Sequence, residues 1–121
     1  MIKHSIEIKK LEDIKTISKK IDNIFTEEEQ KSNKITLTGK FAAKDAFLKN
    51  IGIVPSERFY KKIEIGKMSS GRPFIKILDT NLSNKIAGYK ISLSISHTKE
   101  EAVAICILYK TNNGKKEARY T

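Results

Sequence analysis

Residues 41–51 read Phe41-Ala42-Ala43-Lys44-Asp45-Ala46-Phe47-Leu48-Lys49-Asn50-Ile51. Their large apolar side chains recur at helical spacing and, together with Leu37, form one stripe of a helix. Lys44 falls in the middle of that stripe, and Asp45 lies at its edge, one turn before Lys49. A charge on the apolar face of a core-facing helix is costly unless it meets an opposite charge or reaches water.

Three interpretations of these charges are open. In the first, Lys44 extends past its neighbours and places its ammonium in solvent. In the second, Asp45 and Lys49 form a helix-surface ion pair worth about 0.3 kcal/mol. In the third, the carboxylate and the two ammonium groups act together and hold a divalent cation beside a phosphate.

The composition indicates one ordinary globular domain with a preference for anionic partners. The chain has 121 residues, 39% of them hydrophobic and 31% charged, and a formal net charge of +10. Such a balance favours nucleic acids, phosphorylated small molecules or acidic proteins as partners. There is no signal-peptide pattern and no apolar run of membrane-spanning length, so we expect a cytoplasmic protein. The single cysteine, Cys106, lies in an apolar run and is expected to be a buried structural thiol.

Helical patterns come first along the chain. Residues 2–8 suit a short strand, and residues 11–25 have apolar residues at helical spacing. A capping-box pattern at Thr26 and Glu29 predicts a second, polar helix of about two turns. The helix that contains residues 41–51 is expected to begin near Thr36 or Thr38 and to stop at Gly52.

Strand patterns dominate the second half. Alternating residues predict strands at 62–65, 74–78 and 91–97, and the apolar run 102–109 predicts a buried strand. Turns at 69–73 and 98–100 and a short helix at 79–88 join them. Helices followed by mostly antiparallel strands indicate an α+β fold. We expect one domain over residues 1–110 and a basic, flexible tail over 111–121.

Two further segments carry polar chemistry. In the stretch 91–97, Ile91, Leu93 and Ile95 share one strand face with His97, and three serines occupy the other. His97 is either a rim residue satisfied by its neighbours or a phosphate ligand or proton shuttle at the mouth of a site. Gly71-Arg72-Pro73 is, taken alone, a hairpin turn. No zinc-ligand cluster, Walker loop or serine-hydrolase elbow is present in the sequence.

Together these segments resemble one family, the holo-[acyl-carrier-protein] synthases, which are short 4′-phosphopantetheinyl transferases. That family has a helix of the form Gly-Arg-Phe-Ala-Ala-Lys-Glu-Ala-x-x-Lys, then a Gly-Lys-Pro turn and a Ser-x-Ser-His-Ser/Thr segment. The matching residues here are 39–49, 71–73 and 94–98. The family's Leu-Thr-x-x-Glu is matched by residues 25–29. The resemblance covers residues 4–109.

The resemblance implies a fold, an activity and an assembly. The fold would have helices packed on a mostly antiparallel sheet. The activity would be transfer of 4′-phosphopantetheine from coenzyme A to a serine of apo-acyl carrier protein, with release of 3′,5′-ADP, in fatty acid synthesis. The assembly would be a homotrimer with shared sites, so that His97 serves the Asp45 of a neighbouring subunit.

The resemblance also implies roles for individual residues. Asp45, in place of the family's glutamate, would bind Mg²⁺ or Mn²⁺, because both metals prefer oxygen donors. Lys49 would contact the phosphates and stabilise or protonate the departing one, so Asp45 and Lys49 are the expected catalytic residues. Lys10 and Lys15 would contact the acidic carrier protein. The expected coenzyme A ligands are Lys40, Lys44, Lys49, Arg72, Pro73, Ser96 and His97.

The N-terminus departs from the family pattern Gly-Ile-Asp-Ile-Val-Glu-Ile, whose aspartate is the second metal ligand. An alignment based on Ile6-Glu7-Ile8 places His4 at that aspartate. Imidazole suits Mn²⁺ better than Mg²⁺. Three alternatives remain open. His4 binds the metal, or Asp45 holds the metal with water molecules alone, or the protein has lost catalysis and kept only ligand binding.

Three functions follow from these observations. The first is a metal-dependent phosphopantetheinyl transferase. The second is a weakened or inactive relative that binds coenzyme A or a carrier protein. The third is a small basic nucleic-acid-binding module, against which the chain has only nine aromatic residues, none of them spaced along a strand for base stacking.

Overall fold

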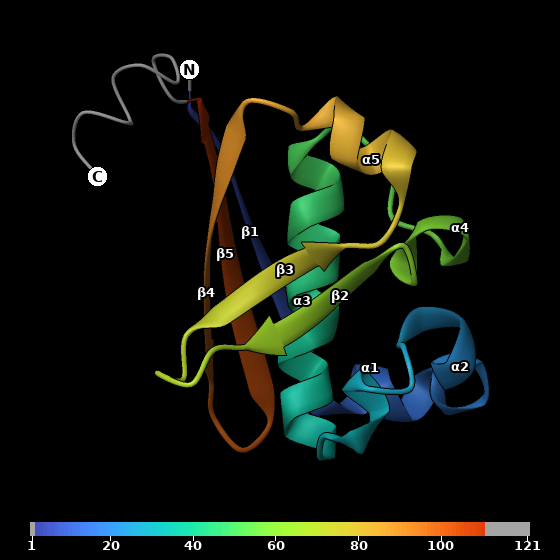
Figure 1. Ribbon diagram of the computed structural model, residues 1–121. Coiled ribbons are helices and arrows are strands. Elements are labelled where there is room, and N and C mark those ends of the chain that lie inside the picture. The colour runs from blue at the N-terminus through green and yellow to red at the C-terminus, as the bar shows by residue number, and fades with distance from the viewer. Residues whose placement is uncertain (1, 111–121) are drawn as a thin grey trace.

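The structure, a computed structural model, describes residues 2–110 and places one long helix between two sheets (Figure 1). Helix α3 (Lys34–Asn50) lies along a three-stranded sheet, and a two-stranded hairpin crosses it on the other side. The predicted α+β fold, with helices packed on antiparallel strands, is confirmed. The tail expected at 111–121 lies outside the described residues.

The three-stranded sheet has the order β1-β5-β4 and is antiparallel throughout. The hairpin pairs β2 with β3. These strands have the bounds β1 (Ile2–Lys10), β2 (Ile63–Lys67), β3 (Pro73–Ile77), β4 (Tyr89–His97) and β5 (Glu101–Lys110). Every strand expected from alternation is present, and β1 extends two residues beyond the expected 2–8.

The first predicted helix, 11–25, is wrong as a single element. It divides into α1 (Leu11–Thr16), a 3₁₀ turn (Ser18–Lys20) and α2 (Ile21–Ile24). The bend lets Ile24 and Phe25 enter the core, where they are 3% and 0% exposed. Isoleucine-rich segments have only moderate helix propensity, so tertiary packing decides their path.

The polar helix expected after Thr26 is also wrong, because only a 3₁₀ turn (Glu29–Lys31) forms there. The capping-box contacts themselves exist: the Thr26 amide donates to Glu29 Oε1 at 2.9 Å, and the Glu29 amide donates to Thr26 Oγ1 at 3.3 Å. Two short helices complete the fold, α4 (Glu57–Tyr60), which the sequence analysis missed, and α5 (Thr80–Lys85).

Helix α3 begins two residues before the earlier of its predicted starts, because Asn33 caps it. The Thr36 amide donates to Asn33 Oδ1 at 2.9 Å. The helix ends at Asn50, and Gly52 follows with a φ of 79°, the left-handed conformation expected after a helix. Gly39 allows β4 to lie close, because a Cβ there would be 2.8 Å from Ile95 Cγ2.

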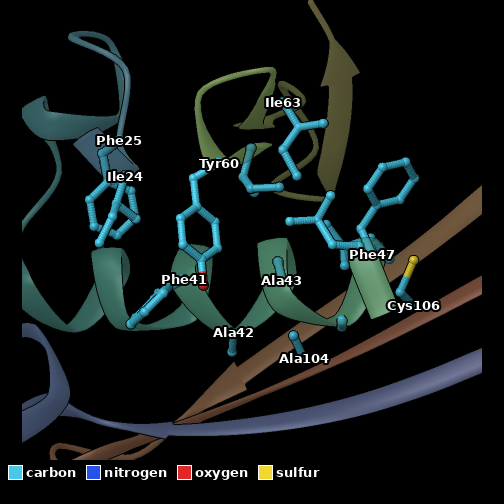
Figure 2. Close-up of a cluster of buried hydrophobic side chains, with 14 of the residues drawn as sticks. Ile24, Phe25, Phe41, Ala42, Ala43, Phe47, Tyr60, Ile63, Ala104 and Cys106 are labelled. Atoms are coloured by element: carbon cyan, nitrogen blue, oxygen red, sulfur yellow. The ribbon is translucent and has the colours of Figure 1, made fainter. Parts of the chain in front are cut away.

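The core lies on both sides of α3. Figure 2 shows Phe41 and Phe47 of the helix among side chains from the N-terminal segment, the hairpin region and β5. The outer face of the three-stranded sheet is different, because apolar side chains there remain exposed: Ile2 70%, Ile8 63%, Ile6 57%, Ile105 37% and Tyr109 37%. None of the helices within residues 2–110 has the length and apolar character that crossing a membrane needs.

Candidate active site

Lys44 is a buried structural residue. Its side chain has no exposed surface, and its ammonium contacts three oxygens: Glu29 Oε1 at 2.7 Å, the Ile24 carbonyl at 2.7 Å and the Tyr60 carbonyl at 2.8 Å. Burial lowers the pKa of Lys44, and the carboxylate of Glu29 opposes that shift. All three N–H donors are used inside the protein.

These contacts correct the prediction that Lys44 binds coenzyme A, because no donor and no surface remain for a phosphate. They also exclude the interpretation in which the ammonium reaches solvent. The anion that Lys44 meets is Glu29, which is itself 0% exposed and accepts the Ile65 amide at 2.6 Å. This ion pair therefore links the N-terminal segment, α3 and β2.

Asp45 is the next residue on α3 and faces β1. Its Oδ2 lies 2.7 Å from the ammonium of Lys9, and its Oδ1 accepts the Tyr60 hydroxyl at 2.7 Å. Figure 2 shows the Tyr60 hydroxyl pointing toward α3. Burial, followed by the hydrogen bond to Asp45, raises the pKa of Tyr60, so the phenol is a hydrogen-bond donor at neutral pH.

Glu7 is a second carboxylate beside Asp45, and the sequence analysis did not assign it a role. Both of its oxygens accept from the Lys49 ammonium, at 2.9 and 3.0 Å. This contact raises the pKa of Lys49, and Asp45 adds a smaller Coulombic contribution in the same direction. Lys49 is half-exposed, whereas Glu7 is mostly covered. Glu7 and Asp45 both interact with Lys49 and with Tyr60, so the acid predicted on α3 lies near a second acid on β1, and each has a lysine partner.

His4 does not join this group. Strand side chains alternate between faces, and Ser5, Glu7 and Lys9 all contact α3 residues. His4 therefore lies on the opposite face of β1, where it is exposed. The prediction that His4 shares a metal with Asp45 of the same chain is corrected, because the sheet separates the two side chains.

The structure indicates a different register for the family resemblance. Glu7 stands between Ile6 and Ile8, as the family's aspartate stands between two isoleucines. That flanking pattern was the signal that could have identified Glu7. Relative to the family, the acid on β1 is one methylene longer and the acid on α3, Asp45, is one methylene shorter, so the combined reach of the two side chains is unchanged.

Glu7 and Asp45 fit a magnesium or manganese ion. Carboxylate oxygens are the ligands that these ions prefer, and Mg²⁺ is commonly held by one or two carboxylates together with phosphate and water. Within residues 2–110, no three His, Cys, Asp or Glu side chains gather into a larger cluster. The protein would therefore supply two ligands, and the substrate and water would complete the coordination.

A cavity of about 340 Å³ lies on the other side of α3, between that helix, the β2–β3 hairpin and the end of β4. Three of the predicted coenzyme A ligands, Lys40, Pro73 and His97, line it, and so does Lys67. Its size is within the range of small-molecule sites, and its cationic lining suits an anionic ligand. The structure therefore brings these three residues together.

The two regions lie toward opposite edges of the three-stranded sheet. Glu7 and Lys9 are on the edge strand β1, His97 is on the edge strand β4, and β5 separates them. Arg72 lines a separate cavity beyond Pro73, and Ser96 lines one next to Ile8. One chain alone thus does not assemble all of the predicted site residues around a single cavity.

Lys10 and Lys15 line a fourth surface cavity, at the start of α1, together with Glu12, Glu100 and Glu101. The two lysines are exposed, as a protein contact requires. Cys106 is 0% exposed, and burial raises its pKa to about 11, so the predicted structural thiol is confirmed.

Comparison with known proteins identifies the family of the chain. No family model matches the chain. The holo-[acyl-carrier-protein] synthase of Clostridium novyi is 35% identical over 102 residues, which cover 78% of this chain and 74% of that protein. The enzyme of the same name from Fusobacterium nucleatum is 35% identical over 114 residues, covering 85% of this chain and 92% of that protein.

Solved structures show the same fold. The holo-[acyl-carrier-protein] synthase of Neisseria meningitidis matches with a TM-score of 0.78 and 27% identity, covering 91% of this chain and 100% of that one. The Bacillus anthracis synthase, solved in complex with CoA (3′,5′-ADP), matches with a TM-score of 0.73 and 28% identity, covering 90% and 96%. The chain belongs to the holo-[acyl-carrier-protein] synthase family.

Proposed function

We propose that this protein transfers 4′-phosphopantetheine from coenzyme A to a serine of apo-acyl carrier protein and releases 3′,5′-ADP. The observation that carries the proposal is the pair of carboxylates, Glu7 and Asp45, beside Lys49 at the edge of the core. The adjacent charge on α3, Lys44, is fully satisfied inside the protein, whereas Lys49 remains half-exposed and able to contact a substrate.

Each residue of this group has a distinct task in the proposed reaction. Glu7 and Asp45 would hold a divalent cation, Mg²⁺ or Mn²⁺, which would neutralise the coenzyme A pyrophosphate and favour ionisation of the serine hydroxyl. The serine oxygen forms a bond to the phosphorus that carries pantetheine, and the bond from that phosphorus to the 3′,5′-ADP oxygen breaks. Lys49 stabilises the charge that develops on the departing phosphate, or donates a proton to it.

The cavity lined by Lys40, Pro73 and His97 is proposed to hold the nucleotide half of coenzyme A. Its lysines and histidine offer donors to phosphate oxygens, and Arg72 and Ser96 lie in neighbouring cavities that an adjoining subunit could complete. Lys10 and Lys15 are proposed to meet the acidic carrier protein, where opposite charge would speed association.

The protein is further proposed to be a homotrimer whose sites lie between subunits, acting in fatty acid synthesis in the cytoplasm. Two observations support the assembly. The carboxylate pair and the nucleotide cavity lie toward opposite edges of the sheet, and Ile2, Ile6 and Ile8 leave an apolar outer face exposed. Such a face favours contact with a partner surface, and head-to-tail contacts form a ring when the rotation between neighbouring subunits closes.

The transfer assay tests the activity. The protein is incubated with coenzyme A, apo-acyl carrier protein and Mg²⁺ or Mn²⁺, and the carrier is weighed by mass spectrometry. Addition of the phosphopantetheine mass is expected with at least one metal. No addition with either metal, together with intact coenzyme A binding, would select the alternative function, a relative that binds without catalysis.

A mixing experiment tests the shared sites. Asp45→Asn and His97→Ala variants, each of low activity alone, are unfolded together, refolded as a mixture and assayed. If one subunit supplies Asp45 and its neighbour supplies His97, random mixing restores intact sites to about a quarter of the wild-type number. Activity that stays at the level of the separate variants would contradict sharing, and sedimentation would report the number of subunits.

A further inference from the structure

Lys9 is a cation beside the proposed metal ligands that neither the family resemblance nor the proposed reaction uses. It lies on β1, two residues after Glu7 and on the same face of the strand, with its ammonium 2.7 Å from Asp45 Oδ2. The ammonium also lies 4.4 Å from the centre of the Phe41 ring, on α3. Lys9 thus has two contacts on α3, an ion pair and a cation–π contact.

The contacts of Asp45 leave little room for an additional cation. The Tyr60 hydroxyl occupies Oδ1 and the Lys9 ammonium occupies Oδ2. The Asp45 side chain is only 5% exposed, so Oδ1 and Oδ2 cannot turn freely toward solvent. A divalent cation at Oδ2 would meet a positive charge at contact distance, and like charges at that separation repel strongly away from bulk water.

Lys9 is nevertheless able to move away. Its side chain is 22% exposed, and four methylenes link the ammonium to the strand, so the charge can leave Asp45 and the Phe41 ring and reach water. The pair between Lys44 and Glu29, both 0% exposed, has no such route. Lys9 and Asp45 therefore form a contact that can exchange.

We propose that Lys9 competes with the divalent cation for Asp45, so that metal binds only when the Lys9 ammonium leaves Oδ2. This inference rests on the proposed function, since it takes Glu7 and Asp45 as the metal ligands. Lys9 is then the residue that sets the metal affinity of this chain, and it lowers that affinity below what the two carboxylates alone would provide.

Metal binding without substrate tests the proposal directly. Mn²⁺ is bound to the full-length wild-type protein and to Lys9→Met, and the dissociation constants are measured by calorimetry and by electron paramagnetic resonance of free Mn²⁺. Methionine keeps an unbranched apolar side chain and removes the charge, and with it the ion pair to Asp45 and the cation–π contact to Phe41. We expect Lys9→Met to bind Mn²⁺ at least about tenfold more tightly than wild type.

Two matched variants separate competition from a general effect of charge. Lys3→Met removes one positive charge from the same strand, but Lys3 lies over the Tyr89 ring and not at Asp45. It should change the Mn²⁺ affinity by less than about twofold, because distant exposed charges are screened. Lys9→Arg keeps the cation and should bind Mn²⁺ no more tightly than wild type does. Circular dichroism confirms folding, and Lys9→Gln replaces Lys9→Met if that variant is unfolded.

Each outcome decides the proposal. Tighter Mn²⁺ binding by Lys9→Met alone supports it. An unchanged or weaker affinity in Lys9→Met overturns it, and so does an equal gain in Lys3→Met or the absence of Mn²⁺ binding in every variant. Failure of the proposed function is seen separately: it is the absence of phosphopantetheine addition by the wild-type protein, whatever the Mn²⁺ affinities are.

Discussion

Lys44 and Asp45 are neighbours on α3, yet the protein uses their charges in different ways. Lys44 is 0% exposed, and protein oxygens satisfy all three of its donors. Asp45 also lies within the protein, but one of its two partners is Lys9, whose ammonium can reach solvent. A buried charge with fixed partners stabilises a fold, whereas a buried charge with an exchangeable partner is available for ligand binding.

Tyr60 connects the two charges. Its carbonyl accepts from Lys44 and its hydroxyl donates to Asp45. The short helix α4 therefore holds both adjacent residues of α3 from the same side. The difference between the structural charge and the proposed functional one thus arises from the surroundings of α3, since the two residues share one helix and one turn.

Removing the structural charge should have the largest effect. Lys44→Met leaves Glu29 buried without its cation and should lower the free energy of unfolding by about 3–5 kcal/mol, as for other broken buried pairs. Urea denaturation followed by circular dichroism measures the change. Lys31→Met, at an exposed ion pair, is the control and should have little effect. Equal stability of Lys44→Met and wild type would mean that the pair is not buried as described.

Removing the proposed metal ligand should affect activity instead. Asp45→Asn keeps the shape and the Tyr60 contact but loses the negative charge, so phosphopantetheine transfer should fall by about 100-fold or more. Glu7→Gln should behave in the same way. The initial rate of mass addition gives the effect, and thermal unfolding shows whether the fold is retained. Full activity in both variants would show that neither carboxylate takes part in the reaction.

Cutting the connection between the two charges should have an intermediate effect. Tyr60→Phe removes the hydroxyl that donates to Asp45 Oδ1 and leaves the Lys44 contact, which uses the carbonyl, in place. The loss of one buried hydrogen bond should lower the free energy of unfolding by about 1–2 kcal/mol. A loss of unfolding free energy as large as that of Lys44→Met would show that Tyr60→Phe disturbs the packing of the ring and does not only remove the hydroxyl contact.

The same residue predicts a pH dependence. The pKa of Tyr60 is raised in the folded protein, so above pH 10.0, its ordinary pKa, the unfolded chain releases the phenol proton before the folded chain does. The stabilisation from this contact is therefore complete below pH 10.0 and is lost as the pH rises through the folded-state pKa. Wild type should lose more stability than Tyr60→Phe between about pH 9 and 11 when both are unfolded with urea.

The smallest effect is expected at His4. Because His4 lies on the opposite face of β1 from Asp45, His4→Asp should not raise Mg²⁺-supported transfer by more than about twofold. The transfer assay at several Mg²⁺ concentrations measures this, with Lys9→Met as the comparison that should lower the Mg²⁺ requirement. A large gain in Mg²⁺-supported transfer by His4→Asp would show that residue 4, and not Glu7, occupies the second metal-ligand position.

The sequence predicted much of the architecture because local patterns decide it. Alternating residues identified β2, β3 and β4, an apolar run identified β5, and the apolar stripe with Gly52 at its end identified α3. The sequence prediction failed at residues 11–25 and at α4. Contacts with the core, and not local periodicity, decide the conformation of these short segments. Asp45 and Lys49 were found together because they share one helix, but Glu7 was missed because the N-terminal alignment was displaced by three residues.

By itself, then, the sequence determined the α+β fold, the family and the acid on α3, since these depend on periodicity and on motifs within single segments. Only the tertiary structure decided which charges on that helix are satisfied. Lys44 finds Glu29, and Asp45 finds Lys9 and Tyr60, across sequence separations that no local pattern reports. Burial of a charge and the exposure of its partner are properties of the packed chain, and they separate a structural ion pair from one that a ligand can replace.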